Sequence, residues 1–541
     1  MLIHLFSFFA ACSDYYTALN GADNDFCHLL QPCSFERVVK KVRPKDIIFI
    51  KGDYIGEPDD LEKARVLFNS ALAQGVIVAS DNMTINGTKL QNVGFSFIVV
   101  QSTEEPRIHS FHFTGFSCSI ACFRTVEKGV ISNSYFTHNH VKGGIGLLSF
   151  GVGKCKLDEC VLVENTVLNS SLISMFSTHL YLNMTLIERN FVKSNSRQAL
   201  LFAINSVCEY TNTTIRFNSS PHSPLHQFEF RSCFGFWNCT FEFNKHPETM
   251  LCDGTCEFNF TNTTISNNMG SFLTTSVHSV VSFNESSIIN NFSGDRPLFY
   301  LPGSEFYILH PCFFIENHGT SILDTRGMKS LINLTNAQFI GNNVDEFVIG
   351  VDESSKVVLN NCKFKENFAL KSSIYSKKSY LEIQNSSFRR NKVAAIKMKK
   401  GKAHIFDSKF MNNIGSNDDS YSILSHGSTL SVSNSYFQGS SPYGHINATG
   451  KVSLFQLSFS GMKKYSLRGS IRSSCILCSY NVGKVKKPKF YFYFVHNLTG
   501  LMIMFTLVSI ILLFLFYSFD YLVKRKCRMN YQNLPNDKLF V

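Results

Sequence analysis

A six-residue pattern recurs twelve times between residues 131 and 440, and it constrains the fold more than any other feature of the chain. It consists of a small residue, a variable position, Phe or an aliphatic residue, two variable positions and Asn. Successive copies are 22 to 28 residues apart. A period in the twenties is typical of solenoids, whose repeats bury their apolar faces only against neighbouring repeats. The copies end at Asn139, Asn165, Asn190, Asn218, Asn244, Asn268, Asn291, Asn317, Asn342, Asn367, Asn391 and Asn413, and a weaker thirteenth copy covers 437–440.

Each repeat reads as strand, bend and strand. Alternating stretches such as 357–359 and 381–383 lie upstream of the pattern, and a period of two is typical of β-strands. An Asn or Asp usually follows, a residue type that tolerates the left-handed backbone of a sharp bend. Stacking the repeats then predicts one interior column of aromatic rings and one of asparagines that pass hydrogen bonds between coils. The predicted columns contain Phe136, Phe241, Phe314, Phe339, Phe364, Phe388 and Phe410, and Asn139, Asn244, Asn317, Asn342, Asn367, Asn391 and Asn413.

The N-terminal region predicts a cap on the first coil. Residues 34–42 form a short amphipathic pattern, 44–54 a strand that ends in a Gly turn, and 60–75 a further helix, before less regular coils over 76–116. A cap protects the otherwise unpaired strands of the first coil. This pairing of helix and strand resembles the start of pectate-lyase-like right-handed parallel β-helices. The predicted fold is therefore all-β, a right-handed parallel β-helix solenoid of about 25-residue coils with an N-terminal helical cap and one C-terminal transmembrane helix.

The two ends of the chain predict export and membrane anchoring. Residues 2–11 form a short apolar leader without Lys or Arg. Residues 498–519 are uncharged and long enough to cross a bilayer, and Lys and Arg follow directly at 524–528. Lysines also precede the span at 484–489, so charge alone does not fix the orientation.

Asn-X-Ser/Thr sequons supply the second topology signal. There are fifteen, roughly twice the number expected from composition, and all precede the span. They favour a type I, single-pass protein of the plasma membrane or an endomembrane, with the repeats extracellular or lumenal. The predicted glycosylation sites are Asn82, Asn86, Asn169, Asn183, Asn212, Asn218, Asn238, Asn259, Asn262, Asn284, Asn291, Asn333, Asn385, Asn447 and Asn497.

The predicted segments follow from these signals. They are a signal peptide at 1–12, the cap and first coil at 13–75, the β-helix at 76–470, a juxtamembrane segment at 471–497, the transmembrane helix at 498–519 and a cytoplasmic tail at 520–541. In the tail, Tyr531 and Leu534 match the spacing that endocytic adaptors read, and Cys527 is a candidate for palmitoylation or a plain free thiol.

Seventeen cysteines suit an oxidising compartment. Six local pairs have spacings at which disulfides within or between coils can form, namely Cys27/Cys33, Cys118/Cys122, Cys155/Cys160, Cys233/Cys239, Cys252/Cys256 and Cys475/Cys478. The last pair also has the spacing of half a zinc site or of a redox motif.

The Phe-x-x-Asn pattern, with a single Gly143-Gly144-Ile145 after Asn139, resembles the polymorphic outer membrane protein repeat of bacterial surface adhesins and the related β-helix surface proteins of parasitic protists. The Gly-Gly half occurs once and a single C-terminal helix replaces the bacterial barrel, so the resemblance favours a eukaryotic, membrane-anchored form. It implies a surface protein in adhesion.

Enzymatic motifs known on this fold are missing from the sequence. Galacturonan hydrolases use an Asn-Thr-Asp strand, an Asp-Asp pair, a Gly-His-Gly turn and an Arg-x-Lys. Here the Asp pairs lie at 59–60 and 418–419, and Gly444-His445-Ile446 lacks the second Gly. Calcium lyases need an acidic cluster and a base, which the coils do not repeat. We therefore predict no enzyme, no catalytic residue, no metal and no cofactor.

Residues 371–409 hold the strongest charge asymmetry. Eleven basic residues face two acidic ones, which gives 11 − 2 = +9 of the net charge of +12. The predicted ligand-binding patch contains Lys377, Lys378, Arg389, Arg390, Lys397, Lys399, Lys400 and Lys402. Its predicted partners are anionic glycans or a host or neighbouring cell surface, not nucleic acid. The alternatives are a lysine-rich edge that prevents strand aggregation, a structural surface rod, or a membrane-anchored polysaccharide-acting enzyme.

Overall fold

The structure is a computed structural model of the 541-residue chain. It describes residues 14–18, 21, 27, 31–90, 96–102, 104–193, 198–276, 278–414, 421–439, 444–460, 467–468, 475–476 and 478–481. All of them belong to the first of two compact units, Met1–Gly483 and Lys484–Val541. Only this first unit is described below.

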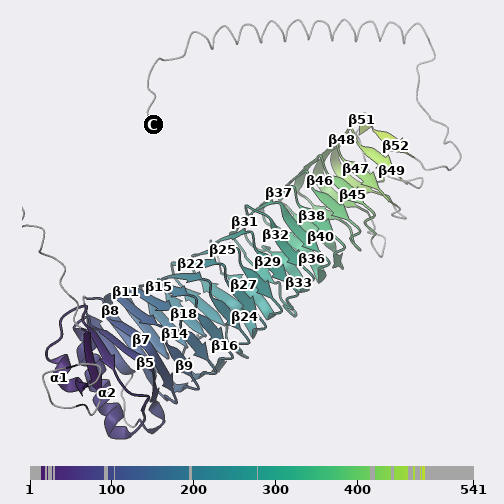
Figure 1. The fold of residues 1–541 in the computed structure, drawn as a ribbon. Helices are drawn as coiled ribbons and strands as arrows, with labels where there is room; N and C mark the ends of the chain where they lie inside the picture. Colours follow the sequence, from purple (N-terminus) through teal and green to yellow (C-terminus); the bar gives the residue numbers. More distant parts are fainter. Residues whose placement is uncertain are drawn as a thin grey trace, which may run out of the picture. The chain divides into compact units, whose positions relative to one another are not determined.

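Its strands form a parallel β-solenoid (Figure 1). Each turn of the chain supplies a strand to three sheets, and every strand pairs in parallel with the equivalent strand one turn away, as Lys356–Asn360 pairs with Tyr380–Gln384. Sheet 1 precedes the predicted Asn bend, sheet 2 contains the repeated Phe, and sheet 3 follows the final Asn of the repeat. The prediction of an all-β parallel solenoid is confirmed.

The strands divide among these sheets as follows. Sheet 1 contains β15 Thr178–Asn183, β19 Val207–Thr211, β22 Ser232–Trp237, β25 Cys256–Thr261, β28 Val280–Asn284, β31 Glu305–Ile308, β34 Leu331–Thr335, β37 Lys356–Asn360, β41 Tyr380–Gln384, β44 Lys402–Phe406 and β51 Cys475–Ile476. Sheet 2 contains β9 Tyr135–Thr137, β12 Val161–Val163, β16 Leu186–Glu188, β20 Thr214–Arg216, β23 Thr240–Glu242, β26 Thr264–Ser266, β29 Ser287–Ile289, β32 Cys312–Ile315, β35 Ala337–Ile340, β38 Lys363–Lys365, β42 Ser387–Arg389, β45 Lys409–Met411, β47 Tyr436–Gln438, β49 Ser458–Ser460 and β52 Ser479–Asn481.

Sheet 3 and the strands that turn a corner complete the coils. Sheet 3 contains β6 Ser96–Ser102, β14 Ile173–Phe176, β18 Leu201–Ile204, β21 His226–Glu229, β24 Lys245–Asp253, β27 Met269–Thr275, β30 Phe299–Tyr300, β33 His318–Asp324, β36 Asn343–Val351, β40 Ser372–Lys377, β43 Ile396–Lys399 and β50 Leu467–Arg468. Strands β8 Ser119–Ser132, β11 Leu148–Asp158, β46 Ile423–Ser433 and β48 Ile446–Phe455 run from sheet 3 into sheet 1, and the short β10 His140–Lys142, β13 Thr166–Leu168, β17 Phe191–Lys193 and β39 Phe368–Ala369 follow sheet 2. Because β51 pairs with β48 and β52 with β49, coil pairing continues to Asn481, beyond the expected end near residue 470.

Two helices lie at the N-terminal end of the solenoid (Figure 1). The cap region contains β1 Asp14–Ala18, β2 Cys33–Ser34, α1 Phe35–Val39, β3 Ile47–Ile50, β4 Tyr54–Ile55, α2 Pro58–Ala73, β5 Ile77–Asn86, the 3-10 turn η1 Gly87–Lys89 and β7 Arg107–Thr114. Phe68 of α2 packs edge-on against Phe35 of α1 and Phe111 of β7. The helices therefore cover apolar side chains at this end of the described coils.

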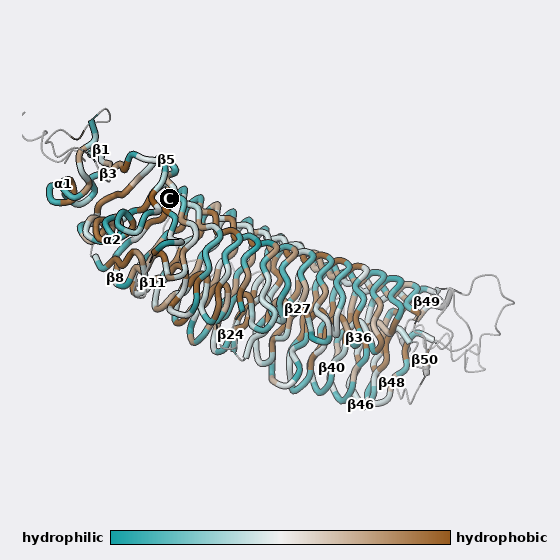
Figure 2. The backbone as a smooth tube through the Cα atoms, turned by 90° about the horizontal axis from the view of Figure 1, so that it is seen from below, coloured by the Kyte–Doolittle hydropathy of each residue, from teal (hydrophilic) through white to brown (hydrophobic). Residues whose placement is uncertain are grey.

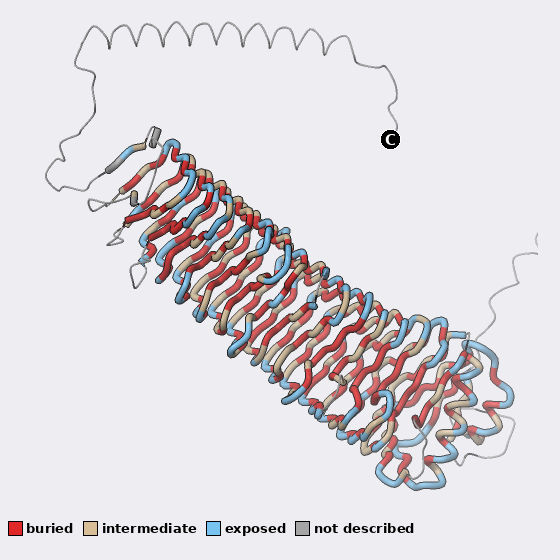
Figure 3. Tube along the Cα trace, turned by 180° about the vertical axis from the view of Figure 1, so that it is seen from behind, coloured by how far each residue is buried: buried red, intermediate tan, exposed pale blue. Residues whose placement is uncertain are grey.

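The core consists of ladders of identical side chains. In sheet 2 the rings of Phe339, Phe364, Phe388 and Phe410 are buried and stack on successive coils with centroids 4.8, 4.7 and 5.0 Å apart. Phe136, Phe241 and Phe314 are also buried. A second stack that we did not predict, Phe236–Phe260–Phe283, lies in sheet 1 with spacings of 4.8 and 4.5 Å. Figure 2 shows apolar residues recurring at the same places in successive coils, and Figure 3 shows buried strands joined by exposed bends.

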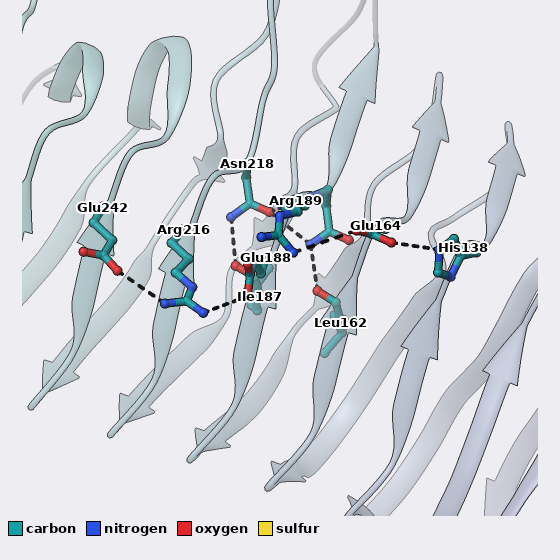
Figure 4. Close-up of polar contacts among 10 residues, drawn as sticks. His138, Leu162, Glu164, Ile187, Glu188, Arg189, Arg216, Asn218 and Glu242 are labelled. Atoms are coloured by element: carbon teal, nitrogen blue, oxygen red, sulfur yellow. Dashed lines mark hydrogen bonds and ion pairs between the residues drawn. The ribbon is translucent and has the colours of Figure 1, made fainter.

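The repeat's final Asn forms a continuous buried ladder from Asn139 to Asn413. At each step the backbone N–H and the side-chain Nδ2 of one Asn donate to Oδ1 of the next, at 3.0 and 3.0 Å for Asn317 to Asn342. The same Nδ2 donates to a backbone carbonyl of a neighbouring coil, as Asn218 does to Ile187 (Figure 4). The ladder thus satisfies backbone groups that the bend after sheet 2 removes from the strand pairing.

Two of the six expected cysteine pairs are seen as disulfides, Cys27–Cys33 and Cys252–Cys256. Three further candidate pairs do not form disulfides: Cys118, Cys122, Cys155, Cys160, Cys233 and Cys239 are free. Cys233 is exposed on β22, whereas Cys239, which follows the bend at Asn238, is buried. The buried Cys160 thiol donates to the carbonyl of Ile131. Burial raises the pKa of Cys160 to about 12, so it is an inert interior thiol. Cys478 is disulfide-bonded, and the side chain of Cys475 is not described.

Several membrane-related predictions fall outside the described residues. These are the leader at 1–12, the span at 498–519, Asn497, Cys527, Tyr531 and Leu534. Within the described ranges, no helix has the length and apolar character needed to cross a bilayer.

Candidate anion-binding edge

The corner between sheets 3 and 1 gathers five of the predicted basic residues on two consecutive coils. Lys377 ends β40 and lies directly opposite Lys399 of β43 in the parallel register. Lys378 and Lys400 follow at equivalent bends with left-handed φ values of 52° and 55°. Lys402 begins β44 on the sheet 1 side of the corner. We call Lys377, Lys378, Lys399, Lys400 and Lys402 the basic edge.

Four of the five ammonium groups of the basic edge have no carboxylate partner in the part of the chain that the structure describes. Among the described residues, no Asp or Glu carboxylate lies within the 4.0 Å limit of an ion pair from Lys377, Lys378, Lys399 or Lys400. The preceding coil carries Asp352 and Glu353 at this corner, which bounds the edge on one side. The four ammonium groups therefore create a positive potential that an external anion can neutralise.

An aromatic ring lies beside the edge. The Lys402 ammonium is 5.8 Å and the Lys356 ammonium 5.9 Å from the centre of the Tyr380 ring, on the coils to either side of it. Sequence reasoning missed Lys356 because it lies outside 371–409, although its spacing of one repeat from Tyr380 was a usable signal. Both contacts are cation–π interactions that hold the lysine stems against sheet 1.

The other three residues of the predicted patch lie away from the basic edge. The eight basic residues therefore do not form the single patch that the sequence predicts. Lys397 lies on sheet 3 opposite Tyr375. Arg389 belongs to β42 of sheet 2, and Arg390, at the bend that follows, pairs with Glu366 at 3.4 Å. The sequence stretch 371–409 passes through all three sheets, so residues adjacent in sequence face different sides of the rod.

The alternative of edge protection does not fit this position. Strand β40 pairs with β36 and β43, and β43 pairs with β40 and β46, so neither is an edge strand with free backbone groups. Like charges directly opposite each other, as Lys377 and Lys399 are, destabilise a sheet. The basic edge therefore destabilises the fold, and neither protection against aggregation nor strand pairing accounts for its presence.

The charges on sheet 2 show the opposite arrangement (Figure 4). His138, Glu164, Arg189, Glu188, Arg216 and Glu242 alternate across five coils, and the ion pairs Arg189–Glu188 and Arg216–Glu188 measure 3.2 and 3.0 Å. Glu188, whose side chain is 7 % exposed, is held by two guanidinium groups. Each of these side chains has an ion-pair partner on the protein, so the row leaves no charge for a ligand.

The structure corrects two of the predicted glycosylation sites. Asn218 and Asn291 are ladder residues with no exposed surface, and Nδ2 of each donates two or more hydrogen bonds inside the core. A glycan is attached through Nδ2, so it cannot be accommodated at either position. The exposed sites Asn212, Asn238, Asn262 and Asn385 lie at the bend between sheets 1 and 2.

No three His, Cys, Asp or Glu side chains in the described ranges converge in a way that would hold a metal ion. His445, part of the incomplete Gly-His turn, is buried, and burial lowers its pKa to about 4. Asp59 and Asp60 lie in the first turn of α2, while Asp418 and Asp419 are outside the described residues.

No known protein family matches the sequence, and no curated protein is similar to it. Among solved structures, the alginate lyase AlyGC of family PL6 is similar over 87% of this chain and 100% of its own, at 9% identity and a TM-score of 0.24. The A-module of the mannuronan C-5 epimerase AlgE4 of Azotobacter vinelandii is similar over 74% and 97%, at 11% identity and a TM-score of 0.23. The tailspike of E. coli bacteriophage HK620, solved with a pentasaccharide, is similar over 86% and 78%, at 9% identity and a TM-score of 0.19.

The first two of these structural neighbours are a lyase and an epimerase, so our prediction that the chain is not an enzyme does not stand. That prediction rested on the absence of hydrolase and calcium-lyase motifs, and the same fold supports other chemistries with other residues. The likeness is one of fold, and the fold of this chain is a parallel β-solenoid.

Proposed function

We propose that the protein binds anionic polysaccharides through the basic edge. The observation that carries this proposal is the pair Lys377 and Lys399, two cations placed directly opposite each other on interior strands without a carboxylate partner. A polymer with a regular negative charge neutralises such a pair and its neighbours at the bend, Lys378 and Lys400. Parallel coils repeat at about 4.8 Å, so the edge offers cations at closely spaced, fixed positions.

The first prediction is that reversing charge at the edge weakens polyanion binding. The triple variant Lys399→Glu, Lys400→Glu, Lys402→Glu should bind immobilised heparin at least about tenfold more weakly than the wild type at physiological salt. The fold should be retained because all three side chains are exposed. Binding is measured with the full-length protein across a salt series, with circular dichroism as the check on folding.

The control variant changes the same charges elsewhere. Lys142→Glu, Lys193→Glu, Lys245→Glu reverses three exposed lysines that lie after sheet 2. It should bind heparin within about twofold of the wild type. If both triple variants bound heparin equally weakly, the effect would come from net charge alone. If the edge variant bound heparin as the wild type does, the proposal would be refuted. Shortening of the polymer during the same incubations would make the protein a polysaccharide-acting enzyme, its other candidate function.

We further propose that the solenoid is the ectodomain of a single-pass, type I membrane glycoprotein of the cell surface or an endomembrane, in adhesion or ligand binding. The support is the uncharged stretch at 498–519, the basic residues that follow it and the excess of sequons before it. The disulfides Cys27–Cys33 and Cys252–Cys256 suit an oxidising compartment. Tyr531 and Leu534 are then the residues that endocytic adaptors would read.

The second prediction tests this topology in cells that perform N-glycosylation. N-glycosidase treatment should lower the apparent mass of the full-length protein, and substitution Asn238→Gln, at an exposed bend, should remove one step of that shift. Asn291→Gln is not a useful control because it breaks the ladder. An antibody against the repeats should label intact cells if the protein reaches the surface. A protein without any glycosidase shift would not have an exported ectodomain.

A further inference from the structure

A pocket of about 580 Å³ lies on the outer face of sheet 1 near the N-terminal end of the solenoid. Its lining comes from four consecutive coils, through β8, β11, β15 and β19. The parallel register places Lys128, Lys154 and His179 in one row and Lys156, Tyr181 and Glu209 in the next. Coils repeat at about 4.8 Å and alternate residues of a strand lie about 6.6 Å apart, so six polar side chains stand on a compact grid. The volume falls within the range of small-molecule sites.

The Tyr181 ring lines the pocket, and His179, which is not itself a lining residue, holds that ring in place. The His179 and Tyr181 rings stack with centroids 4.1 Å apart at 27°. His179 Nε2 lies 2.8 Å from Glu209 Oε1, and the Tyr181 hydroxyl lies 3.2 Å from His179 Nδ1. In the tautomer with the proton on Nε2, His179 donates to Glu209, and its Nδ1 accepts from the Tyr181 hydroxyl. The two rings therefore form a rigid platform that needs no reorganisation when a ligand binds.

One of the three lysines that line the pocket has no ion-pair partner among the described residues. Lys128 pairs with Glu105 at 3.2 Å and Lys156 with Asp158 at 2.9 Å, and Asn183 donates to the same Asp158 at 2.7 Å. Lys154 is exposed and forms no ion pair with a described residue, although it lies opposite Lys128 in the register. Lys154 thus offers a single unsatisfied positive charge beside the His179–Tyr181 platform.

We propose that this pocket binds one carboxylated monosaccharide unit. The sugar carboxylate would pair with Lys154, the ring would lie against the His179–Tyr181 platform, and sugar hydroxyls would donate to the free oxygen of Glu209. A neutral sugar leaves Lys154 unpaired, whereas a ligand with several adjacent negative charges meets Glu209 and Asp158. The balance of one cation, several acceptors and an aromatic platform therefore selects a ligand with a single anionic group and several hydroxyls.

The pocket is a site distinct from the basic edge. Lys154 and Lys402 occupy the same row of sheet 1, ten coil steps apart, which is about 48 Å at the strand spacing. Glu257 and Glu305 lie between them in that row. This inference goes beyond the proposed polyanion binding, because it assigns a second site with a different ligand. A single sugar unit is too short to contact both sites.

One predicted modification bears on the test. Asn183 lines the pocket and begins a sequon with Thr185, so a glycan there would cover the mouth. All proteins compared therefore carry Thr185→Ala, which removes the sequon and leaves Asn183 in place. Thr185 is a buried small residue, and Ala337 is a buried small residue at the equivalent place of its own repeat.

The experiment measures binding of glucuronate, N-acetylneuraminate and glucose to the full-length protein by saturation-transfer NMR and calorimetry. At least one of the two carboxylated sugars should bind, and glucose should bind at least about tenfold more weakly because it lacks the charge. Lys154→Gln and Glu209→Gln should each weaken binding by about tenfold, and Tyr181→Phe by a few-fold. Lys193→Gln, an exposed lysine after sheet 2, is the matched control and should change nothing.

Two outcomes would overturn the proposal. The first is that neither carboxylated sugar binds better than glucose, and the second is that Lys154→Gln binds as the wild type does. The edge variant Lys399→Glu, Lys400→Glu, Lys402→Glu separates this result from the proposed function. It should lose heparin binding and keep monosaccharide binding, whereas Lys154→Gln should do the reverse. Loss of both activities in one variant would show a folding defect and is checked by circular dichroism.

Discussion

Lowering the pH from 7 to 4.5 should destabilise the solenoid by roughly 5 kcal/mol through two buried histidines. His226 of β21 and His246 of β24 have at most 5% exposure. Burial lowers the pKa of each from 6.5 to about 3, and the neighbouring His226 contributes to the shift of His246. A charged imidazole in this core would be desolvated among the rings of Tyr210, Phe228 and Phe241.

The direction of the effect follows from proton binding. The folded pKa lies below the ordinary value, so between pH 6.5 and about 3 the unfolded chain binds a proton that the folded chain does not. The free energy of unfolding is therefore highest above about pH 6.5, where both states hold neutral histidines, and it decreases as the pH falls toward 3. At pH 4.5, two units below the ordinary pKa of 6.5, each histidine contributes about 2.7 kcal/mol, because each pH unit corresponds to about 1.4 kcal/mol.

The measurement is the denaturation midpoint of the full-length protein at several pH values. His226→Phe should lose about half of the pH dependence between 6.5 and 4.5, because the phenyl ring does not titrate. His222→Phe changes an exposed histidine four residues away and should leave the pH dependence as it is. If His226→Phe and the wild type had equal slopes, the two buried imidazoles would not be responsible for acid sensitivity.

Replacing one ladder asparagine should be among the most damaging single substitutions in the protein. Oδ1 of Asn342 accepts from both N and Nδ2 of Asn317, and its own Nδ2 donates to Asn367 and to the carbonyl of Phe314. Asn342→Ala therefore leaves two buried donors and two acceptors without this partner. Each unsatisfied buried donor costs about 1–3 kcal/mol, so the loss should be on the order of 3–6 kcal/mol.

The chain contains its own control for this substitution. Asn343 is the next residue, begins β36 and is exposed, so Asn343→Ala makes the same chemical change outside the ladder. It should shift the denaturation midpoint only slightly, by an amount that corresponds to roughly 0.5 kcal/mol. A similar shift for both substitutions would mean that the ladder bonds add little to stability beyond what water provides to the unfolded chain.

The sequence alone determined the coil. Asn317, Asn342 and Asn367 recur at one period, and Phe339, Phe364 and Phe388 lie three residues before their asparagines in successive copies. In a solenoid each repeat contacts mainly its neighbours, so a local pattern that recurs also specifies the long-range contacts. This is why the parallel fold and its interior ladders could be predicted without structural information.

Only the tertiary structure decided which side chains share a surface. Lys399 and Arg389 are ten residues apart in a uniformly basic stretch, yet one lies at the corner of sheets 3 and 1 and the other on sheet 2. Lys154, Tyr181 and Glu209 are distant in sequence and line one pocket. Bends of variable length set where each coil turns, and the alternation of strand residues sets which face a side chain takes. The sequence period fixes the stacking of equivalent residues, whereas the surface depends on the exact position of every bend.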